Sequence, residues 1–205
     1  MTKYIFVCSM MIFAGLLAST ITNNEVISER IYYEIINPPS PYADYIARYD
    51  ANWFDEVSFV FARETDARIV DIQTGREFYL RRTFGGNHAD VEPLTKEDAA
   101  IMYDIWGGWS WARRPVLVYV NGYIFPGSLT NFPHAGRDDA PALATVNNRS
   151  GGYGRGVNLD AVKGNGVDGH MCLHFAGSLL HGSPARSNPA HQDAVATARN
   201  YLRNR

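Results

Sequence analysis

The chain has 205 residues, with 19 basic and 21 acidic side chains and a formal net charge of −2 at pH 7. This balance excludes the basic surplus by which nucleic-acid-binding domains are recognised, so no nucleic-acid partner is expected. The residues that follow an apolar N-terminal segment are enough for one domain with a sizeable core.

The N-terminal segment has the pattern of an export signal. Lys3 supplies a positive charge, residues 4–17 carry none, and residues 18–20 are small. This order predicts a signal peptide over residues 1–22. The alternative is an uncleaved membrane anchor through residues 4–22, a stretch just long enough to span a bilayer. Both alternatives predict an exported protein that is secreted or membrane-anchored.

The cysteine count bears on the chemistry. Cys8 lies in the expected leader, which leaves Cys172 without an intramolecular partner. An exported domain with one thiol is not a disulfide scaffold. Cys172 is therefore expected to pair between chains, to lie inert in the core, or to react.

The region after the leader divides into an arm and a domain. Residues 23–55 are mixed in composition and contain a cluster of prolines, which predicts a lead-in or linker arm. A single catalytic-type domain is expected over residues 56–205. At its start Val57, Phe59 and Phe61 alternate with polar residues, which predicts a β-strand.

Turn and capping signals predict the remaining elements. Residues 135–168 contain seven glycines and few apolar side chains, which predicts a long surface loop that is either functional or disordered. The fold class expected is α+β, with a mainly antiparallel or mixed sheet and two or three helices. The other predicted elements are strands over 68–72 and 77–82, a helix from Thr95 to Gly107, a hairpin over 115–120 and 123–128, a strand over 170–175, and a helix from Asn188 to Leu202.

The predicted strand over residues 170–175 carries the single thiol. Its three apolar side chains point one way, and Cys172 points the other way between His170 and His174, each about 7 Å along the strand. A neighbouring imidazolium lowers a thiol pKa and activates the thiol as a nucleophile. Gly169 fits a turn whose N–H groups could stabilise an oxyanion. The alternative for the two histidines is a solvated face.

A second polar cluster follows a pair of glycines. His88, Asp90 and Glu92 share one face if this segment is extended. With His174 they could bind zinc. They could equally orient a catalytic imidazole or cap the following helix. No cofactor is favoured, and zinc stays the alternative.

Several blocks of the sequence resemble those of a little-characterised family of bacterial exported proteins associated with the cell wall. The resemblance covers roughly residues 55 to 202. The blocks are Asn87-His88-Ala89-Asp90-Val91-Glu92-Pro93-Leu94-Thr95, Ile105-Trp106-Gly107-Gly108-Trp109-Ser110-Trp111, Arg113-Arg114-Pro115, Pro133-His134-Ala135-Gly136 and Gly169-His170-Met171-Cys172-Leu173-His174-Phe175, followed by Ser178, His181-Gly182 and His191-Gln192.

The order of His134, a glycine-rich loop and then Gly-x-x-Cys-x-His is similar to that of L,D-transpeptidases. The resemblance implies a mainly β fold, Cys172 as nucleophile, His134 as base, and His170 or His174 as an orienting or charge-stabilising group. The chain departs from that family in two ways. The interval from His134 to Cys172 is longer, as a loop insertion would make it. Gly169-His170-Met171 also replaces the usual Ser-His-Gly, which changes the residues around the oxyanion hole.

Three functions remain open on the sequence. The first is a cysteine acyl-transfer enzyme that uses Cys172 on peptidoglycan stem peptides. The second is a zinc-dependent cell-wall peptidase that uses His88, Asp90 and His174. The third is a non-catalytic wall-binding module. Arg113 and Arg114 suit the recognition of substrate carboxylates, and Trp109 and Trp111 suit a docking face.

Overall fold

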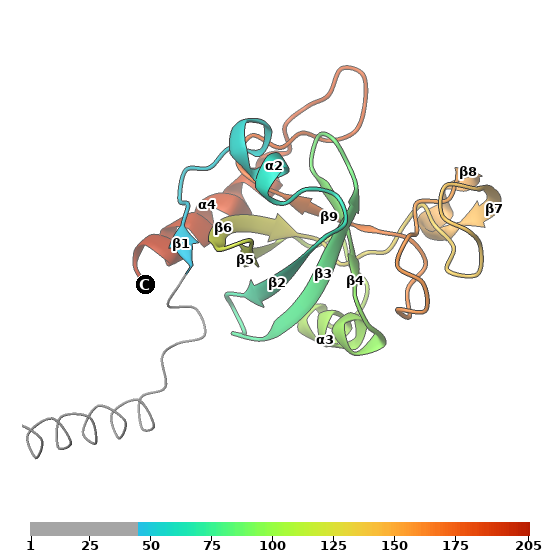
Figure 1. Ribbon diagram of the computed structural model, residues 1–205, viewed down its shortest axis with the longest axis horizontal. Helices are drawn as coiled ribbons and strands as arrows, with labels where there is room; N and C mark the ends of the chain where they lie inside the picture. The colour runs from blue at the N-terminus through green and yellow to red at the C-terminus, as the bar shows by residue number, and fades with distance from the viewer. Residues whose placement is uncertain (1–44) are drawn as a thin grey trace, which may run out of the picture. The chain divides into compact units, whose positions relative to one another are not determined.

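Six antiparallel strands form the centre of the computed structural model, which describes residues 45–205 (Figure 1). Their order is β6-β5-β2-β3-β4-β9, and β9 pairs back with β6, so the sheet closes into a barrel. A short strand β1 adds to β6 in parallel. The strands are β1 (Ile46–Ala47), β2 (Thr65–Asp71), β3 (Glu77–Phe84), β4 (Ala89–Pro93), β5 (Arg114–Val120), β6 (Tyr123–Leu129) and β9 (Met171–His174).

Three α-helices and a small second sheet complete the described part. α3 contacts β3 and β4, and α4 packs against β5 and β6. The α+β class, the antiparallel sheet and the helix number are confirmed. The closure of the sheet was not predicted. The helices are α2 (Ser58–Val60), α3 (Lys96–Trp106) and α4 (Pro189–Arg203), with a π-turn η1 (Trp53–Val57) and a 3₁₀ turn η2 (Ser150–Gly152), and the second sheet is β7 (Thr145–Arg149) with β8 (Gly154–Val157).

Both long helices begin as their capping residues predicted. The Thr95 hydroxyl accepts from the backbone N–H of Asp98, whose carboxylate accepts in turn from the Thr95 N–H, a complete capping box. The same carboxylate accepts the backbone N–H of Tyr79, which ties α3 to β3. α4 starts after Asn188, whose side chain accepts from the N–H of His191.

The predicted strand over residues 57–61 is wrong, because this segment is helical. Trp53, Val57 and Phe61 are four residues apart and fully buried, whereas Phe59 is 73% exposed. That spacing is the period of a helix rather than of a strand. The segment 45–55, expected as part of a linker arm, also belongs to the folded unit. Residues 1–44, with the predicted leader or anchor, lie outside the described residues.

Arg82 connects the first helical turns to the turn before β4. Its buried guanidinium donates to the carbonyls of Ser58 at 2.8 Å and Gly85 at 2.9 Å, and it lies over the ring of Trp53. The Trp53 indole donates to the carbonyl of Gly86 at 2.8 Å. These contacts position the chain that leads into the second polar cluster. Within residues 45–205, no helix combines the length and apolarity needed to cross a bilayer.

Candidate functional site

Strand β9 places the thiol on the outer wall of the barrel. Met171 and Leu173 are fully buried in the core, as the alternation predicted, and Cys172 is partly exposed on the opposite face. β4 runs antiparallel beside β9 with Asp90 directly opposite Cys172, so these side chains share a face. The alternative of a solvated face is wrong, because both histidines that flank the thiol are at most 2% exposed.

His134 reaches the thiol because β6 continues alongside β9. The Thr130 N–H donates to the Cys172 carbonyl at 3.1 Å, and His134 and His170 exchange two backbone hydrogen bonds of 3.0 and 3.1 Å. Residues 131–133 are left out of this pairing. The antiparallel register therefore brings together two residues that are 38 positions apart.

The ring of His134 is oriented as a base for Cys172. Its Nε2 lies 3.8 Å from the Cys172 Sγ, and its Nδ1 lies 3.0 Å from the carbonyl oxygen of Phe132. A carbonyl can only accept, so Nδ1 carries the proton of the neutral ring. The lone pair of Nε2 then faces the thiol, which is the arrangement that a general base requires.

Burial keeps both members of this pair neutral. It lowers the pKa of His134 to about 4, with a further contribution from His170. Burial, and then the charge of Asp90, raises the pKa of the Cys172 thiol, while Arg113 opposes the rise. Both shifts oppose a resting pair of thiolate and imidazolium in the free protein. The geometry suits a thiol that loses its proton during attack.

Two glycines hold the strands of the site together at close range. A Cβ on Gly169 would overlap the carbonyl of His134, and one on Gly136 would overlap Gly169 itself. Gly169 has φ +89°, and its N–H donates to the buried carboxylate of Asp160 at 2.6 Å. The expected oxyanion role of Gly169 is wrong, because this donor is already used.

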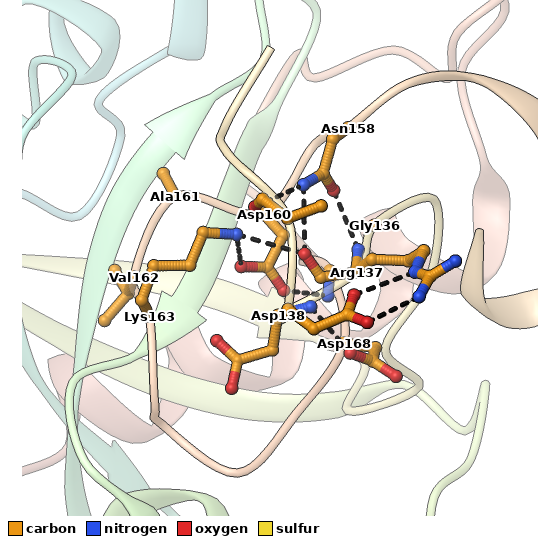
Figure 2. A network of polar contacts seen from close by, with 12 residues as sticks. Gly136, Arg137, Asp138, Asn158, Asp160, Ala161, Val162, Lys163 and Asp168 are labelled. Carbon is orange, nitrogen blue, oxygen red and sulfur yellow. Dashed lines mark hydrogen bonds and ion pairs between the residues drawn. The ribbon is translucent and has the colours of Figure 1, made fainter. Parts of the chain in front are cut away.

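The segment between His134 and Gly169 folds back on itself through a polar network (Figure 2). The Asn158 side chain accepts from the N–H of Arg137 at 2.7 Å and donates to the Arg137 carbonyl at 2.9 Å. Lys163 donates to Asp160 at 2.6 Å. The segment is thus not wholly a loop, since β7, η2 and β8 lie within it, away from the barrel (Figure 1). Because the two ends of the segment pair with each other through His134 and His170, the long interval in sequence still leaves His134 near Cys172.

Asp90 is the centre of the imidazole cluster. Burial alone would raise its pKa, but the neighbouring imidazoles of His181, His88 and His170 bring it below its usual range. The Asp90 Oδ1 lies 3.3 Å from His88 Nε2, 3.4 Å from His181 Nε2 and 3.7 Å from His170 Nε2. A lasting carboxylate charge thus lies beside the imidazoles that surround the thiol.

His174 takes a different position from the one expected. Its ring stacks between those of His88 at 4.1 Å and His191 at 3.8 Å. Burial, and then the neighbouring histidines, lower its pKa, so the ring is neutral. Neither ring nitrogen of His174 has a hydrogen-bond partner. The catalytic and metal roles expected of His174 stay predictions, and in the structure these stacking contacts hold its ring.

The two arginines expected to bind substrate differ. Arg114 makes a bidentate ion pair with Asp71, at 2.8 Å for each bond, and lies over the ring of Trp106. This is a structural role. Arg113 is exposed and lowers the pKa values of Cys172 and His191 through its charge. Arg113 therefore adds a positive charge that acts on the thiol.

The two tryptophans lie in different parts of the structure. Trp111 is 41% exposed, and its ring centroid lies 4.9 Å from that of His134. Trp109 packs edge-on against Tyr103 and lines a separate surface hollow with Lys96. Only Trp111 of the two lies at the thiol.

Sequence reasoning did not assign a role to two groups at the site. Tyr153 is exposed, with its ring 5.3 Å from His134. His181 reaches Asp90 from a segment after β9, with 56% of its side chain exposed. A usable signal was the histidine total of six, because the ring contacts and Asp90 connect all six into one cluster.

Comparisons with protein-family models, with curated proteins and with solved structures found no match for this chain.

Proposed function

We propose that this protein is an exported cysteine acyl-transfer enzyme that acts on peptidoglycan stem peptides, as L,D-transpeptidases do. The observation that supports it is the Cys172–His134 pair, with Nε2 facing Sγ at 3.8 Å and Nδ1 held by a carbonyl. The order of the two residues along the chain and the β architecture are in keeping with the same proposal. Export rests on the N-terminal pattern of the sequence.

The reaction follows from the neutral pair. His134 Nε2 takes the proton of Sγ as the thiolate attacks a peptide carbonyl carbon, and a C–S bond forms. The tetrahedral adduct collapses, the C–N bond breaks, and the imidazolium returns the proton to the leaving amine. An acceptor amine, or water, then releases the acyl group from the thioester and restores the thiol.

The surroundings supply charge and contact area for a peptide. The Asp90 carboxylate favours the imidazolium form of His134, since its charge raises the pKa of that ring. We assign Arg113 to the binding of a substrate carboxylate. The rings of Trp111 and Tyr153 both lie close to that of His134 and are exposed aromatic surfaces against which a peptide can pack.

The test is a comparison of wild type with Cys172→Ala and Cys172→Ser on purified stem peptides and muropeptides, followed by mass spectrometry. Wild type is expected to show a thioester adduct on Cys172 and a new or shortened peptide. Both variants should lose turnover by several orders of magnitude while their thermal unfolding stays close to that of wild type.

Turnover and binding measurements on the same variants distinguish the cysteine enzyme from the other two functions. Turnover that survives in Cys172→Ala and stops on chelation would reject the cysteine mechanism in favour of a metallopeptidase. Tight binding of wall fragments by wild type and Cys172→Ala alike, with no adduct and no turnover in either, would reject catalysis in favour of a binding module.

A further inference from the structure

His88 has a buried nitrogen with no hydrogen-bond partner. Its Nδ1 lies 2.8 Å from the carbonyl oxygen of Leu179, so Nδ1 carries the proton of the neutral ring. The residue is 1% exposed, and its Nε2 makes no hydrogen bond. This nitrogen faces the carboxylate oxygen of Asp90 at 3.3 Å. When Nε2 carries no proton, it and the Asp90 oxygen are two acceptors that face each other in a buried site, which is unfavourable unless a cation lies between them.

The thiol completes a group of three donors. The ligand atoms of His88, Asp90 and Cys172 all lie within 4.8 Å of one another. Ligand atoms of a tetrahedral zinc site are about 3.4–3.8 Å apart, as follows from bond lengths of about 2.0–2.3 Å. Small rotations of the three side chains therefore suffice to enclose an ion.

The chemistry of the three donors is that of a zinc site. Imidazole nitrogen, carboxylate oxygen and thiolate sulfur are the ligand types that Zn²⁺ takes in proteins. A metal-binding histidine usually donates its other ring N–H to a carbonyl or carboxylate, which fixes the ring. His88 has this feature in its bond with Leu179.

We propose that His88, Asp90 and Cys172 bind a divalent cation of the zinc class, and that the bound ion blocks the thiol. Binding releases the proton of Cys172 to solvent, and a metal–sulfur bond forms. His181, at the exposed edge of the group, marks the path by which an ion enters and can supply the fourth ligand. Ion binding stands independently of the proposed acyl transfer, whereas the blockade of catalysis rests on it.

The experiment uses Co²⁺ and Zn²⁺ as probes on purified wild type. Co²⁺ is expected to bind one equivalent and to give a sulfur-to-cobalt charge-transfer band, which only a thiolate ligand produces. Zn²⁺ should displace it and should slow the alkylation of Cys172 at least tenfold. Cys172→Ala should lose the band entirely.

Two ligand variants and one matched control test the other residues. His88→Gln and Asp90→Asn should each weaken Zn²⁺ binding by about 10- to 100-fold or more, a range seen even for residues that only support ligands. His191→Gln changes a buried histidine outside the group and should leave Zn²⁺ binding within about threefold. Circular dichroism checks that each variant is folded. If His88→Gln does not fold, the loss of Zn²⁺ binding is measured on Asp90→Asn alone.

Two results would overturn the proposal. One is Co²⁺ binding without the charge-transfer band, and the other is Zn²⁺ binding of equal strength in wild type and in the ligand variants. Either result leaves the proposed acyl transfer intact, because that is judged by the thioester adduct on metal-free protein. Conversely, an absent adduct together with the cobalt band would reject acyl transfer and retain the metal site.

Discussion

Glu92 gives a sharp test of how the barrel holds the loop before β9. Its carboxylate is fully buried and accepts the backbone N–H groups of Ala161 at 3.0 Å and Val162 at 2.9 Å. Burial nonetheless raises its pKa from 4.5 to about 7. The folded state therefore holds a proton that the unfolded chain releases at lower pH.

The sign and size of the effect follow from linkage. Between pH 4.5 and 7 the folded protein binds more protons at this site than the unfolded chain, so the free energy of unfolding falls as pH rises. A shift of this size corresponds to about 3 kcal/mol in total. Below pH 4.5 Glu92 does not lower the free energy of unfolding, and above pH 7 its full effect on that free energy is reached. Glu92→Gln removes this titration, so the stability of the variant should rise relative to wild type across that window.

Urea unfolding of both proteins at intervals from pH 4 to pH 8 measures the effect. The difference in free energy of unfolding between variant and wild type should change by about 3 kcal/mol over this range, since other titrating groups cancel. Glu64→Gln, at an exposed glutamate, is the matched control variant. Parallel curves for Glu92→Gln and wild type would refute the reasoning, because Glu92 would then have the same pKa in the folded and unfolded states.

Further predictions concern the glycine contact and the arginines. Gly169→Ala should lower the free energy of unfolding by more than about 2 kcal/mol in urea, because its Cβ would overlap backbone. Gly152→Ala, also at positive φ but in open space, should cost only about 1 kcal/mol, and equal losses would contradict the packing role. Arg114→Lys should cost about 1–3 kcal/mol because it breaks the bidentate pair with Asp71. Arg113→Gln should leave stability within about 0.5 kcal/mol and raise KM for stem peptides in a turnover assay, and a destabilised variant with unchanged KM would oppose its substrate role.

Much of the local structure could be predicted because its signals lie within a few residues of each other. The Thr95–Asp98 capping box and Pro189 at the start of α4 are such signals, and the structure has both. The error at residues 57–61 came from using alternation over too short a window. Trp53, outside that window, shows the helical period when it is read with Val57 and Phe61.

The barrel and its site could be predicted only in part because they depend on contacts between distant segments. Alternation correctly predicted which side chains of β9 face the core. Nothing local indicates that β9 pairs with both β4 and β6, which is what brings Asp90 and His134 to the thiol. His170 and His174 are equally far from Cys172 along the strand, but their surroundings differ because the neighbouring residues come from segments distant in sequence. The spacing alone therefore could not distinguish the two histidines.

The two proposed uses of Cys172 make opposite demands on one proton. Acyl transfer needs the neutral thiol to give its proton to His134, so the burial that raises the thiol pKa keeps the nucleophile protonated until a substrate is in place. Metal binding needs the same proton to leave for solvent, and the positive charge of the ion compensates for that burial. Asp90 assists both. Its charge stabilises an imidazolium at His134, and its carboxylate supplies a metal ligand beside His88. A single carboxylate opposite the thiol therefore connects the proposed activity to its proposed control.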